Sequence, residues 1–160
     1  MSHTDTLDGA TVCFLNYGTG SALDLAAGNT GNGTPLIGYQ YHGGKNQQWK
    51  LEQVDHSTVW PTWKLHNVQT GTCADLAGGS SANGTIVHGW EKLDNNKNQL
   101  FRFVSADPQG RVVMIQNVGT GTYIDLFNGG SANSTKIIGW EGSPESQNPN
   151  QIWRILRMNY

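Results

Sequence analysis

Short runs of apolar and β-branched residues, each bounded by glycine, asparagine or proline, recur along the chain at intervals of roughly ten residues. Three of these runs have closely similar patterns, at residues 11–17 (TVCFLNY), 62–68 (TWKLHNV) and 112–118 (VVMIQNV). A second set lies at residues 46–54, 98–106 and 150–158. No segment shows a helical period over a helical length. The pattern predicts an all-β barrel or sandwich.

The chain is a threefold internal repeat. The segment around Asp24 recurs around Asp75 and Asp125, at separations of 51 and 50 residues. A period of this size predicts one structural unit per repeat, with repeats at about 11–56, 62–107 and 112–160 inside a single domain over 1–160. Four strands in each unit give twelve, and a repeat that leaves no open edge predicts a barrel capped by hairpins.

Composition excludes several classes of partner. Only 14% of the residues are charged, against a usual value of about 25%, and the net charge is −2. Without a cluster of Lys and Arg along the sequence, we expect no binding to nucleic acid and no membrane insertion. The first residues do not resemble a secretion signal, so a cytoplasmic location is expected. Cys13 and Cys73 occupy different positions in their repeats, as buried packing thiols do.

Each repeat ends in a Gln-x-aromatic motif that resembles the signature of ricin B-type lectins, which are β-trefoils. The motifs are Gln47-Gln48-Trp49, Gln99-Leu100-Phe101 and Gln151-Ile152-Trp153. In that family an Asp precedes a sugar-stacking aromatic by fifteen residues, and this spacing occurs here in all three repeats. The Asp-Leu and Gly-Trp pairs are most similar to mushroom members, including galactoside-binding agglutinins. The resemblance covers about residues 11 to 157.

The resemblance implies a multivalent, non-enzymatic lectin for terminal galactose or N-acetylgalactosamine, working without metal or cofactor. Its partners would be glycoproteins or glycolipids, its role would be defence, and it could assemble as a homodimer. The residue chemistry independently suits a sugar: an ionised acceptor on an open site, an amide that both donates and accepts, a flat aromatic surface, and a glycine that admits close approach. The expected carbohydrate-binding residues are Asp24, Gly28, Tyr39, Asn46, Asp75, Gly79, His88, Trp90, Asn98, Asp125, Gly129, Trp140 and Asn150.

The repeats differ at the rim of each expected site. From the aromatic residue to the asparagine the chain runs 7, 8 and 10 residues in the successive repeats. Two residues before the aromatic stand Ile37, His88 and Ile138, of which only His88 can make a polar sugar contact. The third repeat keeps the mushroom-like loop best, so it is expected to hold the most intact site, followed by the second.

Other conspicuous residues are interpreted as structural. The closing aromatics should be core and the glutamines should bond to backbone and hold loops. The sequons at Asn32, Asn83 and Asn133 fall where hairpin turns are expected. Histidines without counterparts in other repeats are assigned to solvent or packing: His3, His42, His56 and His66.

Two other functions remain open on the sequence. Trefoils also serve as protease inhibitors that act through surface loops, which would make no use of the Asp–aromatic–Asn set. A triad could be drawn from Cys73 and Asp75 with His66 or His88, although Cys73 occurs in one repeat only. The aspartates could also simply stabilise turns.

Overall fold

The computed structural model describes residues 7–56 and 59–159. Within them lie twelve strands and no α-helix, so the expected β-trefoil of twelve strands is confirmed. No helix in these residues is long and apolar enough to cross a membrane. The strands are β1 Thr11–Asn16, β2 Ala22–Leu25, β3 Thr34–Tyr39, β4 Trp49–Asp55, β5 Thr62–Asn67, β6 Cys73–Leu76, β7 Thr85–Trp90, β8 Phe101–Ser105, β9 Val112–Asn117, β10 Tyr123–Leu126, β11 Thr135–Trp140 and β12 Trp153–Arg157.

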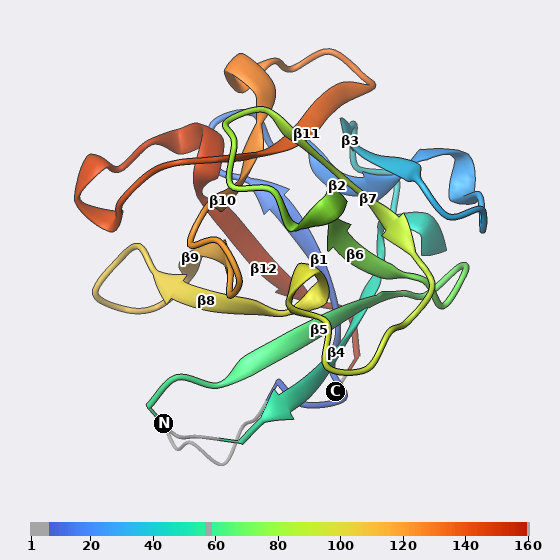
Figure 1. The fold of residues 1–160 in the computed structure, drawn as a ribbon. Coiled ribbons are helices and arrows are strands. Elements are labelled where there is room, and N and C mark those ends of the chain that lie inside the picture. Colours follow the sequence, from blue (N-terminus) through green and yellow to red (C-terminus); the bar gives the residue numbers. More distant parts are fainter. Residues whose placement is uncertain (1–6, 57–58, 160) are drawn as a thin grey trace.

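The first and fourth strands of the repeats form a closed barrel (Figure 1). β1 pairs with β4 and β12, β9 pairs with β12 and β8, and β5 pairs with β8 and β4. All six strands therefore have two neighbours, and none presents a free edge at which another chain could add a strand.

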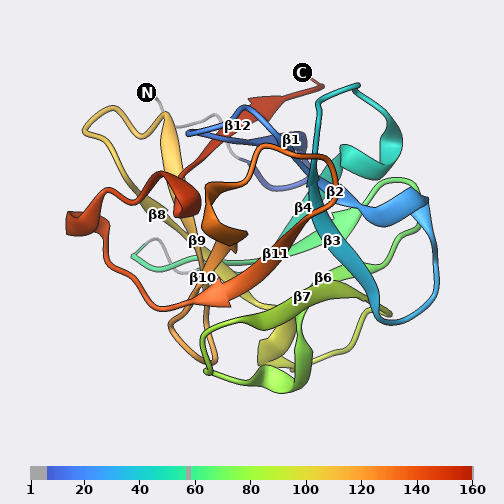
Figure 2. The same cartoon turned by 90° about the horizontal axis from the view of Figure 1, so that it is seen from above.

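The second and third strands of each repeat form three hairpins that cap the barrel. β2 pairs with β3, β6 with β7, and β10 with β11. The three returning strands also pair with one another, β3 with β7, β7 with β11 and β11 with β3. Figure 2, seen from above, shows β3, β7 and β11 meeting in this cap.

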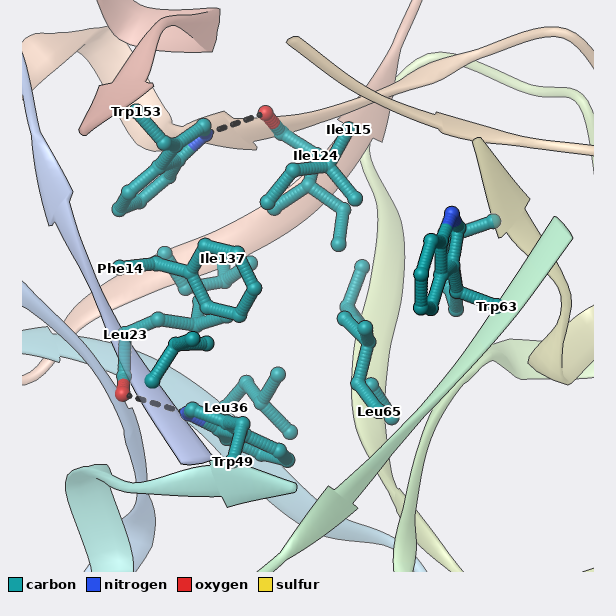
Figure 3. Packing of buried hydrophobic residues seen from close by; sticks show 14 of the residues in the cluster. Phe14, Leu23, Leu36, Trp49, Trp63, Leu65, Ile115, Ile124, Ile137 and Trp153 are labelled. Carbon is teal, nitrogen blue, oxygen red and sulfur yellow. Dashed lines mark hydrogen bonds between the residues drawn. The ribbon is translucent and has the colours of Figure 1, made fainter. Parts of the chain in front are cut away.

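The closing aromatics fill the barrel, as expected. Trp49, Phe101 and Trp153 are fully buried in one apolar cluster. Figure 3 shows the two tryptophans in this cluster with Phe14 and Leu65. The two indole N–H groups do not remain unpaired, because Trp49 Nε1 donates to the Leu23 carbonyl at 3.0 Å and Trp153 Nε1 to the Ile124 carbonyl at 3.1 Å. Each bond joins a closing strand to the hairpin of its own repeat.

The fourth strands begin later than the sequence pattern indicated. A single 3₁₀ turn precedes each of them, at Lys45–Gln47, Lys97–Gln99 and Pro149–Gln151. The Asn-Gln pairs that open the expected strands lie in these turns. As a result, the turns bring both side chains toward the hairpin rather than along the barrel wall.

The sequon asparagines lie at hairpin turns, as expected, and they also link the repeats. The side-chain oxygen of Asn32 accepts from the backbone N–H of Glu91, that of Asn83 from Glu141, and that of Asn133 from Gln40. These bonds are 2.7 Å, 2.8 Å and 2.8 Å long. Each repeat thus holds the backbone that directly follows the site aromatic of a neighbouring repeat.

Candidate functional site

Strand register explains the fifteen-residue spacing. Asp24 lies opposite Ile37 in the first hairpin, Asp75 opposite His88 in the second and Asp125 opposite Ile138 in the third. Each site aromatic stands two residues further along its strand and so projects from the same face as the residue opposite the aspartate. The spacing therefore places a carboxylate and an aromatic ring diagonally across one face of every hairpin.

The aspartates are not openly exposed, which corrects the sequence expectation. Asp24, Asp75 and Asp125 are 2%, 3% and 4% exposed. One carboxylate oxygen, Oδ2, accepts from the side-chain amide of Gln47, Gln99 or Gln151, at 2.9, 3.0 and 2.9 Å. A buried carboxylate needs such donors, because burying an unpaired charge is costly. The glutamines therefore support the aspartates directly.

The glutamines also hold the rim loops, as the sequence predicted. Each Nε2 donates a second bond, to the carbonyl of Gln40, Glu91 or Glu141. Gln47 Oε1 accepts from the backbone of His42 and Gly43, and Gln99 Oε1 from that of Leu93. Gln151 Oε1 is buried without a partner among the described residues, so the third loop is held by fewer bonds.

The second oxygen of the carboxylate distinguishes the three sites. Asp24 Oδ1 accepts from Asn46 Nδ2 at 3.0 Å, and Asp75 Oδ1 lies 3.0 Å from His88 Nε2. Asp125 Oδ1 receives no hydrogen bond from any residue in the described part of the chain, because Ile138 occupies the position of His88 and the Asn150 amide does not donate to the carboxylate as Asn46 does in the first site. The third site therefore has an acceptor atom available to a ligand.

The site asparagines also differ between the first site and the other two. The side-chain amide of Asn46 donates to Asp24 Oδ1 and to the Leu25 carbonyl. The side-chain amides of Asn98 and Asn150 bond to none of the described residues and remain available. Gly79 and Gly129 make room for them, because a Cβ at these positions would lie 2.5 and 2.7 Å from the asparagine Oδ1.

All three site glycines adopt positive φ. The angles are 63° at Gly28, 62° at Gly79 and 64° at Gly129. They belong to short turns that follow the aspartate strands, and a residue with a Cβ is strained at such a positive φ. All three glycines are thus favoured by the turn, and Gly79 and Gly129 also by the space beside the asparagine.

The aromatic residues are accessible to a ligand. Tyr39 and Trp90 are partly exposed, and Trp140 is 37% exposed. In the second site the His88 and Trp90 rings lie 5.2 Å apart. In the first, Tyr39, Asn46, Asp24 and their neighbours line a hollow of about 500 Å³.

His42 is a first-site residue that the sequence did not reveal. Its ring meets Tyr39 edge to face at 5.9 Å, and its Nε2 lies 3.8 Å from Asp24 Oδ2. It escaped detection because neither of the other repeats has a histidine at that position. His3, assigned with it to solvent or packing, lies outside the described residues.

Burial shapes the acidity of two site aspartates. It raises the pKa of Asp125 above the ordinary aspartate value, and the hydrogen bond from Gln151 opposes this in part. Burial likewise raises the pKa of Asp24, against bonds from Gln47 and Asn46 and the charge of His42. Both groups therefore take up a proton at higher pH than a solvated aspartate.

A thiol–imidazole–carboxylate chain exists elsewhere in the second repeat. Cys73 Sγ lies 3.4 Å from His66 Nδ1, and His66 Nε2 lies 2.7 Å from Glu52 Oε1. The acid of this chain is Glu52, not the Asp75 considered from the sequence. Cys73 is fully buried, which raises the pKa of its thiol to about 11. A catalytic thiol requires the opposite shift together with access to solvent.

Groups of three or more His, Cys, Asp or Glu side chains suited to a metal ion do not occur within residues 7–56 and 59–159. The polar groups of the three hairpin sites are carboxylate, amide and, in two of them, imidazole. These groups can exchange hydrogen bonds with neutral hydroxyls, and the neighbouring ring can cover an apolar face.

Comparison with known proteins identifies the family. The model of the family described as "Ricin-type beta-trefoil lectin domain-like" matches residues 3–90, 45–140 and 97–160. The chain belongs to this family. No relative among the curated proteins matched the sequence.

Solved structures similar to this ricin B-type chain include lectins and a designed protein. The designed threefold symmetric protein ThreeFoil superposes with a TM-score of 0.82 and 27% identity, over 94% of this chain and 100% of that chain. The agglutinin of Rhizoctonia solani gives 0.81 and 27%, over 96% and 99%. The ricin B-like lectin of Macrolepiota procera, solved in complex with lactose, gives 0.73 and 24%, over 96% and 99%.

Proposed function

We propose that the chain is a non-enzymatic lectin that binds terminal galactose or N-acetylgalactosamine at the hairpin sites, without metal. The observation that carries this proposal is the repeated set of carboxylate, amide, glycine and aromatic ring on one hairpin face. Such a set can accept and donate hydrogen bonds to vicinal sugar hydroxyls while the ring covers the C–H face. The lactose complex of the Macrolepiota lectin supports a galactoside as the ligand.

The third site is proposed as the strongest. It combines an available carboxylate oxygen on Asp125, an available amide on Asn150 and the exposed ring of Trp140. The second site has an available amide, but His88 already contacts its carboxylate. In the first site Asn46 and Asp24 satisfy each other, so a sugar must compete with an internal hydrogen bond.

Single sites of this kind bind weakly. Two or three hydrogen bonds and one stacked ring, set against the cost of association, leave a dissociation constant on the order of 1 mM. Function therefore depends on several sites engaging clustered glycans, which raises avidity without new contacts. Cross-linking of foreign glycoconjugates, as in defence, is the role that this valency suits.

The test is a titration of the protein with methyl β-galactoside, followed through the indole N–H resonance of Trp140. The Asp125→Asn variant keeps the shape of the side chain but removes its charge, so binding at this site should weaken roughly ten- to a hundredfold. Asp94→Asn is the matched control, because Asp94 is 90% exposed and lies on another repeat. Equal binding by wild type and Asp125→Asn would contradict the site.

A glycan array, together with papain and trypsin inhibition assays, tests the alternative that the chain is a protease inhibitor. The proposal expects galactose-terminated glycans on the array and no inhibition of either protease. Clean inhibition together with an empty array would replace the lectin by a loop-based inhibitor.

A further inference from the structure

Three of the four arginines of the chain gather away from the hairpin sites. Arg111, Arg154 and Arg157 line a hollow of about 420 Å³, and the first two also line an adjoining hollow of about 380 Å³. Arg154 on β12 lies opposite Val112 of β9, which places it beside Arg111. The sequence showed no basic cluster because Arg111 lies far along the chain from Arg154 and Arg157.

The arginine hollow, defined by Tyr17, Arg111, Gln147, Arg154 and Arg157, is a local excess of positive charge on a chain of net charge −2. Arg111 forms an ion pair with Asp107, to which its Nε donates at 3.3 Å. Asp107 in turn also accepts from the backbone N–H groups of Arg111 and Val112. Among the described residues, no acidic side chain lines the larger hollow, whereas Asp107 lines the smaller one.

Arg154 is the central group. It lines both hollows, its side chain is exposed, and the guanidinium forms no hydrogen bond or ion pair with another residue in the described part of the chain. A guanidinium presents a planar fork of N–H donors that matches two oxygens of a carboxylate or a sulfate. The hollow therefore has a donor set ready for an anion.

The walls favour a sugar ring over a bare ion. Tyr17 is 57% exposed and offers an aromatic surface next to Arg154. Gln147 also lines the smaller hollow, and its amide is fixed by bonds to the Ala106 and Pro144 carbonyls. Hollows of about 380 and 420 Å³ exceed the needs of a small anion and lie in the range of pockets that hold organic ligands.

We propose that the arginine hollow binds an acidic saccharide, with Arg154 and Arg111 on its carboxylate or sulfate and Tyr17 against its ring. A nucleic acid or an anionic membrane fits less well, because both need cations spread along an extended face, whereas this charge is confined to one hollow. The hollow shares no side chain with the carboxylate sites. It can therefore bind an acidic sugar whether or not those sites bind galactose.

The test uses a heparin tetrasaccharide, which carries both sulfate and carboxylate, and maltotetraose as the neutral probe of equal length. Calorimetric titration of the whole chain should show binding of the first probe only, weakened by added salt. Arg154→Gln should weaken it by about tenfold or more. Lys50→Gln is the matched control, because it removes the same charge from an exposed residue outside the hollow.

Two further measurements separate the possible results. Tyr17→Ala should weaken tetrasaccharide binding but leave binding of free inorganic sulfate unchanged, which distinguishes a saccharide site from an anion site. The same variants should still bind methyl β-galactoside, so failure here is distinguishable from failure of the galactoside sites. Equal loss in Arg154→Gln and Lys50→Gln would overturn the proposal. Tighter, Arg154-dependent binding of a DNA oligonucleotide or of phosphatidylserine vesicles would overturn it too.

Discussion

The side-chain oxygen of Asn83 accepts a hydrogen bond from the backbone N–H of Glu141, the residue that follows the exposed Trp140. A hairpin tip of the second repeat thus positions the aromatic wall of the third site. The equivalent bond from Asn32 reaches Glu91, beside Trp90 of the second site. Each site accordingly depends on a residue of another repeat.

Asn83→Ala should weaken galactoside binding at the third site severalfold and lower the free energy of unfolding by about 1 kcal/mol, the usual contribution of one hydrogen bond. Asn32→Ala is the matched control, since it should affect the second site instead. Site-resolved titration through the Trp90 and Trp140 indole signals measures both effects. If either variant changes all sites alike, the local account of these asparagines is wrong.

Replacement of Asp125 should separate its two roles. Asp125→Ala removes an acceptor of the buried Gln151 amide and should cost about 1–3 kcal/mol of stability. Asp125→Asn keeps an acceptor there and removes a buried charge, so its stability at neutral pH should stay close to that of wild type or exceed it. Both variants should lose sugar binding at this site. Denaturant unfolding decides the matter, and an Ala variant as stable as wild type would show that the buried bond contributes nothing.

Sugar binding should weaken on acidification at a higher pH than the ordinary aspartate value of about 3.9 would suggest. The reason is that burial raises the pKa of Asp125 and Asp24, so their acceptor charge is lost as pH falls through these raised values. Sugar titrations at pH values from about 3 to 8, which bracket the titration of a carboxyl group, measure the pH at which half of the binding is lost.

Protonation of Asp125 and Asp24 should weaken sugar binding, but it should favour the folded state. Because the folded-state pKa is raised, the stability that each group contributes is fully present below its unfolded pKa and is lost as pH rises through the folded pKa. Asp125→Asn should remove its share of this pH dependence. If the pH midpoint of sugar binding lay at or below the pKa of a solvated aspartate, this would contradict the raised pKa of Asp125 and Asp24.

Gly129→Ala tests the space beside Asn150. The new Cβ would lie 2.7 Å from Asn150 Oδ1, and φ at this position is 64°. Gly121→Ala is a matched control, because φ there is 78° but the nearest atom would be 3.8 Å away. Both should lose stability by about 1 kcal/mol or more, from the positive φ. Only Gly129→Ala should weaken sugar binding, and equal binding by both variants would remove Asn150 from the site.

Chelation should leave sugar binding unchanged, since carboxylate, amide and aromatic groups contact hydroxyls directly. Titrations in EDTA should match those in buffer alone. A loss of binding in chelator that calcium restores would require a different site chemistry.

The sequence predicted the arrangement of the hairpins well because the aspartate and its aromatic are local to one hairpin. A fixed register converts their fifteen-residue spacing into a shared face. The partnership between aspartate and glutamine was missed because the two lie 23 to 26 residues apart and meet only through the turn before the closing strand. For the same reason burial of the aspartates was not foreseen, since it depends on these distant segments packing together.

The first and last strands lie side by side. The Thr11 N–H donates to the side chain of Asn159 at 2.8 Å, and the Met158 N–H donates to the Thr11 carbonyl at 2.8 Å. The two ends of the described fold could therefore be joined by a short linker, and the chain opened instead at the loop between two repeats. Such a circular permutant would preserve every strand pairing while moving the termini to that loop. The order of the three repeats along the polypeptide is thus a matter of connectivity, and the closed ring that they form in space is not tied to any one starting point.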